Sequence, residues 1–136
     1  YIQTGTVTTH AILLSIPSMI LVAAIMLANN IRDVEEDTIG GRKTLTILVG
    51  RTHAITILTL FFVISYSWII ALVLFGQLTP WALLILLSVK KPIQAVSTFR
   101  KHILPLQVAP AMKNTAVTNT LFGLLLGIGI LIGHLF

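Results

Sequence analysis

Charged residues and cysteine are scarce in this chain. Only 10% of its 136 residues are charged, aspartate and glutamate together number four, and cysteine is absent. A soluble domain carries about a quarter charged residues, so this chain has too few polar side chains to cover a folded body in water. The lack of cysteine argues against a disulfide scaffold, thiol chemistry and cysteine-ligated zinc. A soluble enzyme and a disordered tail are disfavoured for the same compositional reasons.

Apolar residues are abundant instead, at 56% of the chain, and the mean hydropathy is +0.98. A membrane-spanning helix needs about 20 consecutive, mostly apolar residues. Four segments meet this condition, at about 8–29, 54–75, 79–99 and 115–136, and we expect a loop at 30–53. We therefore predict an all-α, polytopic membrane protein in which residues 1–136 form a single transmembrane domain. Pro17, inside the first predicted span, indicates a kink whose free backbone groups neighbouring helices satisfy.

The nine basic residues give the four predicted spans an orientation. With four crossings they all fall on one side of the membrane, which the positive-inside rule makes the cytoplasmic side. The net charge of +5 then marks topology rather than nucleic-acid binding. We expect a multi-pass protein of the cytoplasmic membrane, embedded in the lipid bilayer, with segment 30–53 in the cytoplasm. The basic residues are Arg32, Arg42, Lys43, Arg51, Lys90, Lys91, Arg100, Lys101 and Lys113.

Two lysines interrupt the third predicted span. Lys90 and Lys91 end its apolar run before it is long enough to cross a membrane. Either the helix continues through Pro92 to about Phe99 with the lysines reaching toward the interface, or it stops at a water-filled cavity. In the second case the lysines could lie near an anionic ligand.

The four acidic residues all lie within five positions, directly after the first predicted span. Asn29, Asp33 and Asp37 are spaced i, i+4 and i+8, which places them along one face of a helix. Their oxygen atoms are of the type that Mg²⁺ prefers, and Mg²⁺ usually binds through one or two carboxylates plus substrate phosphates. We predict that Asp33 and Asp37 are metal ligands, and that Glu35 and Glu36, which point off this face, are solvated.

A basic segment follows the acidic residues. It reads Gly40-Gly41-Arg42-Lys43-Thr44 and combines a flexible backbone with two cations. Such a segment can approach a phosphate closely, because arginine offers a planar fork of donors and lysine a point charge. By itself this is a weak signal, but beside two carboxylates it favours a diphosphate ligand.

The run Asn29-Asn30-x-Arg32-Asp33-x-x-x-Asp37-x-x-x-Gly41-Arg42-Lys43-Thr44-Leu45 resembles the second aspartate-rich motif of the UbiA superfamily of intramembrane prenyltransferases. It looks closest to the branch whose aromatic acceptor is 1,4-dihydroxy-2-naphthoate. Residues 1–5 and Pro92 to Gln94 extend the resemblance over the chain.

The resemblance implies a nine-helix bundle, of which this chain supplies the last four helices. It implies Mg²⁺ as cofactor at Asp33 and Asp37, and transfer of a polyprenyl group from polyprenyl diphosphate to the naphthoate with decarboxylation, as in menaquinone biosynthesis. A second motif on amino-terminal helices of the same chain would complete the site, so the fragment alone should be inactive. No general base or other catalytic side chain is assigned. The residues implied to contact the diphosphate are Asn29, Asn30, Arg32, Arg42 and Lys43.

Three alternatives remain open at this point. The first is a related prenyltransferase with another aromatic acceptor. The second is a small four-helix transporter, although the predicted span interiors lack the carboxylates that usually couple transport to ions. The third is a non-catalytic assembly subunit, for which the small-residue pairs Gly123/Gly127 and Gly129/Gly133 could provide contacts, although packing within the chain is the simpler role for them.

Overall fold

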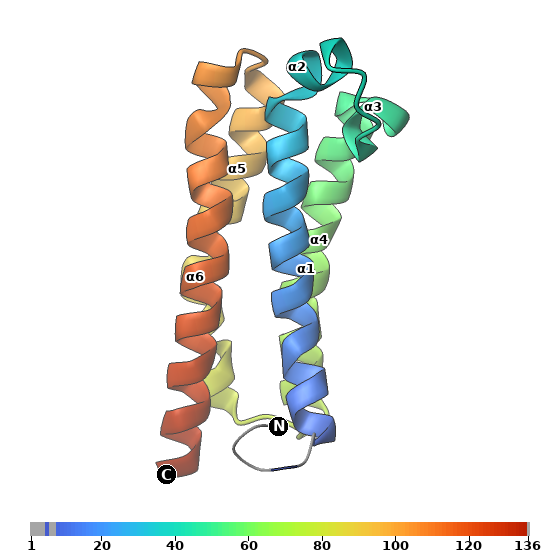
Figure 1. The fold of residues 1–136 in the computed structure, drawn as a ribbon. Helices are drawn as coiled ribbons and strands as arrows, with labels where there is room; N and C mark the ends of the chain where they lie inside the picture. Colours follow the sequence, from blue (N-terminus) through green and yellow to red (C-terminus); the bar gives the residue numbers. More distant parts are fainter. Residues whose placement is uncertain (1–4, 6–7, 136) are drawn as a thin grey trace.

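Residue 5 and residues 8–135 are described by a computed structural model, in which the chain forms a bundle of helices (Figure 1). Four helical segments are long and apolar enough to cross a membrane, as predicted, and the described residues contain no strand. The elements are α1 (Thr9–Arg32), α2 (Val34–Ile39), α3 (Leu45–Val49), α4 (Arg51–Leu74), the 3₁₀ helix η1 (Pro80–Ser88), α5 (Lys90–Lys101) and α6 (Pro105–Leu135).

Two predicted boundaries differ from the structure. The helix that contains the fourth predicted span begins at Pro105, so Lys113 lies within α6 and not in a connection. Segment 30–53 is largely helical: α1 continues to Arg32, α2 and α3 follow, and α4 starts at Arg51. Of the opening residues 1–5 that carried part of the resemblance, only Gly5 is among the described residues.

The four long segments stand side by side around a common centre. α1 packs against α4 and α6, and η1 with α5 packs against the same two helices. α1 and α5 are therefore diagonal neighbours across the bundle. The start of α1 and the end of α6 lie at one end, and α2 and α3 lie at the other (Figure 1).

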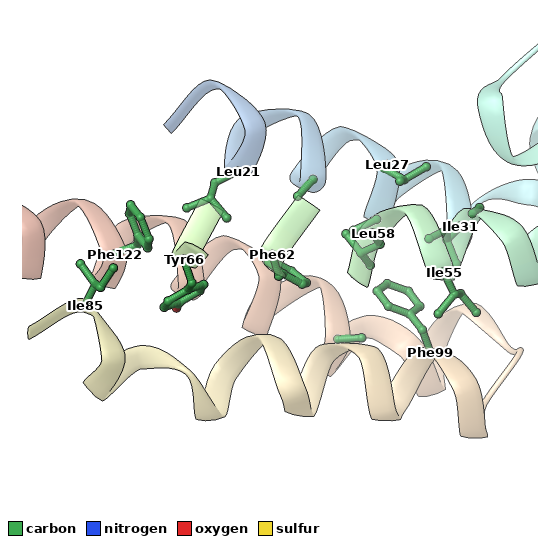
Figure 2. Packing of buried hydrophobic residues seen from close by; sticks show 14 of the residues in the cluster. Leu21, Leu27, Ile31, Ile55, Leu58, Phe62, Tyr66, Ile85, Phe99 and Phe122 are labelled. Atoms are coloured by element: carbon green, nitrogen blue, oxygen red, sulfur yellow. The ribbon is translucent and has the colours of Figure 1, made fainter. Parts of the chain in front are cut away.

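Large side chains fill the centre of this bundle (Figure 2). Leu58 of α4, Phe99 of α5 and Phe122 of α6 are at most 1% exposed. The rings of Tyr66 and Phe122 meet edge to face, with centroids 5.2 Å apart and planes at 88°. Because lipid tails are as apolar as these side chains, close packing rather than escape from water holds such helices together. The centre of the bundle is thus a packed core.

Pro17 leaves one backbone carbonyl of α1 without its helical donor, and a neighbouring helix supplies a donor, as predicted. Pro17 has no N–H, so the carbonyl of Leu13 lacks its helical hydrogen-bond donor. The indole Nε1 of Trp68, on α4, donates to that carbonyl oxygen at 2.9 Å. The Ser65 hydroxyl, whose main acceptor is the Phe61 carbonyl, also lies 3.4 Å from the Pro17 carbonyl oxygen.

We expect Trp68→Phe to destabilise the protein by about 1–2 kcal/mol, because it leaves the Leu13 carbonyl unpaired inside the membrane. Pro17→Ala restores the N–H donor within α1, so the same Trp68→Phe change should cost less in a Pro17→Ala background. Thermal or denaturant unfolding of the four proteins in one detergent measures this coupling. Equal costs in both backgrounds would show that the indole acts by packing alone.

The third span changes helix type half-way along. It continues past both lysines to Lys101, but as a 3₁₀ helix up to Ser88 and an α-helix from Lys90. The change lies four residues before Pro92, whose ring would clash with the Ser88 carbonyl in an uninterrupted α-helix. Lys90 lies 11 residues, or about 16 Å along the helix, from Lys101. The two lysines are therefore within the span, instead of at its end.

The two glycine pairs of α6 have different surroundings. A Cβ added to Gly129 would overlap the backbone of Trp81, and one added to Gly133 would overlap the Thr79 side chain. This pair therefore lets α6 approach η1 closely, which confirms the simpler expectation of packing within the chain. Gly123 and Gly127 have no atom within 4 Å of an added Cβ, so their side of α6 is open.

Candidate functional site

The predicted metal ligands lie where α1 passes into α2. The Asp33 N–H donates to the Asn29 carbonyl at 2.9 Å, and the Asp37 N–H donates to the Asp33 carbonyl at 2.8 Å. Helical hydrogen bonding thus continues across the break at Asp33, and these three residues stand on successive turns. The structure therefore has the i, i+4, i+8 arrangement on which the metal prediction rests.

The first two residues of this row face away from the core of the bundle. Ala24, Ala28 and Ile31 are at most 1% exposed and pack inward, whereas Asn29 and Asp33 are half-buried on another side of the helix. At about 100° per residue, Asn29 points well away from those three. Asp37, the last residue of the row, is buried.

The end of α2 brings the basic segment back onto Asp37. Gly41 has φ +65°, a conformation that suits glycine, and its N–H donates to the Thr38 carbonyl at 3.1 Å. The Arg42 N–H donates to the Asp37 carbonyl at 2.9 Å. These two bonds form a Schellman motif, which usually joins the same two positions by an apolar contact. Here an ion pair takes that place, with Arg42 Nη1 2.9 Å from Asp37 Oδ1.

Both carboxylates are neutralised by arginines. The Asp37 side chain is only 6% exposed, so its charge needs a partner. Arg42 is that partner, and 74% of the Arg42 side chain remains exposed at the surface. Arg32 donates to both oxygens of Asp33, at 2.5 and 2.7 Å. These hydrogen bonds hold the pKa of Asp33 below its ordinary value.

The remaining predicted residues are less constrained. Lys43 is exposed and forms no ion pair with any described residue. Asn30 is half-buried and lies about 100° around the helix from Asn29, off the row of carboxylates. Glu35 and Glu36 are exposed, as expected for solvated side chains.

The donor atoms fit Mg²⁺ only as part of a larger ligand set. Within residues 5 and 8–135, no group of three or more His, Cys, Asp or Glu side chains is placed to hold a metal. Asp33 and Asp37 offer two carboxylates, and one oxygen of Asp37 has no arginine partner. Mg²⁺ commonly binds through one or two carboxylates together with substrate phosphates, so this pair suits an ion shared with a phosphate.

Arg51, whose charge predicted only membrane orientation, joins helices beside this site. Its guanidinium donates to the carbonyl of Ile31 at 2.8 Å, of Phe99 at 3.0 Å and of His102 at 2.6 Å. It thereby ties the end of α1, beside Asp33, to the end of α5. The only signal in the sequence is an arginine directly after Gly50 at the start of an apolar run.

Two threonine hydroxyl groups, one at the end of the basic segment and one in α3, lack a hydrogen-bond partner within the described part of the chain. The side-chain oxygens of Thr44 and Thr46 are buried and have no hydrogen-bond partner among the described residues. An unpaired buried hydroxyl is costly, so these two are candidates to meet a ligand or water. Thr44 directly precedes α3 and Thr46 lies within it, and neither position gives a sequence signal of this kind.

The profile of the UbiA prenyltransferase family matches residues 1–102, three quarters of the chain and all of the α1–α2 site. This chain belongs to the UbiA prenyltransferase family. Membership favours a transferase over the four-helix transporter and the assembly subunit, and it agrees with the resemblance found in the motif.

Two curated relatives carry the same description, 1,4-dihydroxy-2-naphthoate octaprenyltransferase. The protein from Bacillus subtilis (strain 168) is 51% identical over 134 residues, which cover 98% of this UbiA-family chain and 43% of that protein. The protein from Haemophilus influenzae (strain ATCC 51907 / DSM 11121 / KW20 / Rd) is 40% identical over 50 residues, covering 37% of this chain and 16% of that protein. The chain thus spans less than half the length of these relatives. No solved structure matches it significantly.

Proposed function

We propose that this chain carries one half of the active site of a membrane prenyltransferase. The reaction transfers a polyprenyl group from polyprenyl diphosphate to 1,4-dihydroxy-2-naphthoate, with loss of CO₂ and release of diphosphate, to give demethylmenaquinol, the reduced form of demethylmenaquinone. The observation that carries this proposal is the row Asn29–Asp33–Asp37, with an arginine on each carboxylate, in a chain 51% identical to a naphthoate octaprenyltransferase.

The charges of this row suit a diphosphate leaving group. Breaking the bond between the first prenyl carbon and the diphosphate oxygen leaves the electron pair, and so negative charge, on the diphosphate. Arg32, Arg42 and the exposed Lys43 stabilise that charge when they turn toward the phosphates, and the Asn29 amide can donate to the same group. Mg²⁺, when bound by Asp33 and Asp37, supplies Lewis-acid neutralisation of the diphosphate.

The acceptor chemistry agrees with the lack of an assigned general base. A new carbon–carbon bond forms between the prenyl carbon and the ring carbon that carries the carboxylate. The carboxylate then leaves as CO₂, and its electron pair restores the aromatic ring. Prenyl simply replaces carboxylate, so no side chain has to remove a proton from the ring.

The other half of the site should come from further helices of the same chain. Three observations support this: Asn29 and Asp33 face away from the core, the described residues provide only two carboxylate ligands, and the Bacillus subtilis relative is more than twice as long as the matched region. We propose that those helices present an opposing Asn-x-x-x-Asp motif and complete a nine-helix bundle. The grouping of α2, α3 and most cations at one end supports placing that end in the cytoplasm and the protein in the cell membrane.

A direct test compares acceptors. The purified full-length protein in detergent with Mg²⁺ and polyprenyl diphosphate is expected to prenylate 1,4-dihydroxy-2-naphthoate and release one CO₂ per product, with at least about a hundredfold lower kcat/KM for 4-hydroxybenzoate. Residues 1–136 alone are the matched control and should give no product. Faster turnover of 4-hydroxybenzoate would contradict the assigned acceptor, and product from the fragment would contradict the half-site.

A further inference from the structure

A cavity of about 580 Å³ lies between α4 and α5. It is bounded by α4 residues 59–67 and by residues 89–101, which comprise Val89 and α5, with no contribution from α1 or α2. Val63, Ile93 and Val96 are among its apolar residues, and Arg100 and Lys101 are the only charged residues that line it. It is thus an apolar groove inside the span that ends at two cations.

A second cavity adjoins the charged end of this groove. It measures about 390 Å³ and is lined by Arg51, Thr52, Thr56 and Arg100, together with three apolar residues. Arg100 lines both cavities, so they meet at its side chain. An elongated apolar compartment is thereby joined to a smaller compartment with cationic and hydroxyl-bearing walls.

The two cations at this junction have no acidic partner among the described residues. The ion pairs among the described residues involve only two cations, Arg32 and Arg42. All four acidic residues of the chain lie at positions 33–37. The guanidinium of Arg51 is already committed to three carbonyls. Arg100 and Lys101 are both exposed and remain available for an anion.

We propose that the α4–α5 groove binds one acyl chain of a phospholipid with an anionic headgroup, whose phosphate lies at Arg100 and Lys101. The volume is within the range of ligand pockets, about 300–1,000 Å³. Basic pockets between membrane helices, at the end with excess positive charge, attract anionic lipid headgroups. Neither cavity is lined by Asp33 or Asp37, so the groove is distinct from the carboxylate row that is proposed to hold the diphosphate.

Lipid binding to the full-length protein tests this inference independently of prenyl transfer. The protein, delipidated in a neutral detergent, is titrated with phosphatidylglycerol or phosphatidylcholine, and bound lipid is counted by native mass spectrometry. We expect one tight phosphatidylglycerol and no equivalent phosphatidylcholine. In R100Q/K101Q the affinity for phosphatidylglycerol should fall about 30-fold. The matched control K90Q/K91Q removes two charges from the same helix outside the cavity and should leave the affinity within about twofold.

A second variant separates chain binding from head binding. Val96→Trp fills the groove and keeps both cations, so it should also weaken phosphatidylglycerol binding, while thermal unfolding in lipid-free detergent checks that each variant is folded. Equal binding of both lipids, or equal losses in R100Q/K101Q and K90Q/K91Q, would overturn the proposal. So would displacement of the bound phosphatidylglycerol by stoichiometric polyprenyl diphosphate, because the groove would then belong to the donor substrate.

Discussion

Replacing Asp37 by asparagine is expected to lower the kcat of prenyl transfer by about 10²–10³-fold in the full-length protein. Asparagine has nearly the same shape but no charge, so it weakens metal binding and leaves Arg42 without its carboxylate. Asp33→Asn should have a similar effect. Initial rates at saturating donor and acceptor, over a range of Mg²⁺ concentrations, measure the loss and any shift in the Mg²⁺ requirement.

The same segment offers a matched control for this experiment. Glu36 lies one residue before Asp37 but is exposed and outside the row, so Glu36→Gln should keep turnover within about twofold. Folding is not expected to suffer in Asp37→Asn, because the mutation removes a buried charge and Arg42 stays hydrated. Near-normal turnover in both aspartate variants would remove the metal assignment, whereas loss of folding in either would show a structural role.

The pKa of Asp33 adds a pH dependence to this expectation. Hydrogen bonds from Arg32 lower the pKa of Asp33. The carboxylate therefore stays mostly ionised when the pH falls to the ordinary pKa of an aspartate. Arg32→Gln removes this support and raises the pKa of Asp33 toward normal. The acidic limb of the kcat/KM–pH profile, which reports ionisations of the free enzyme, should therefore move to higher pH in Arg32→Gln.

Each carboxylate of the site is paired with an arginine, so charge is balanced locally. This balance suits a site at a membrane boundary, where an uncompensated buried charge is costly.

The parts of this structure that follow local rules could be predicted from the sequence. Span number follows from apolar length, and the row Asn29–Asp33–Asp37 follows from helical spacing. The pairing of Asp37 with Arg42 could not be predicted, because it depends on the left-handed conformation of Gly41 reversing the chain. The sequence also predicts a loop at 30–53, because α2 and α3 have only six and five residues and are too short to show a helical period.

Contacts between residues distant in the sequence leave no local pattern at all. The Trp68 indole on α4 replaces the hydrogen bond that Pro17 removes from α1. The sequence predicts the need for such a donor but not which residue supplies it. Arg51 reaches carbonyls 20, 48 and 51 positions away, and its charge alone suggested topology. The cavity between α4 and α5 likewise depends on how helices distant in the sequence pack, which hydropathy does not record.

Arg51→Met is expected to loosen the α1–α2 junction and, through it, to reduce prenyl transfer. Hydrogen bonds to a charged group are worth about 1.5–3 kcal/mol each, so losing those to Ile31, Phe99 and His102 should speed amide exchange at Asp33 and Asp37 by about a hundredfold or more. Hydrogen–deuterium exchange with mass spectrometry of the full-length protein in detergent measures this directly.

Kinetic readouts distinguish such positioning from direct contact with substrate. If Arg51 acts only by holding the end of α1, then Arg51→Met should lower kcat and raise the Mg²⁺ requirement together, because Asp33 is misplaced. Arg51→Lys keeps the charge but lacks the planar fork, so it should recover little of the exchange protection. Lys113→Met, which removes an exposed lysine from α6, is the control and should change neither quantity. Full rescue by lysine would mean that charge at this position matters, and not the three hydrogen bonds that join α1 to α5.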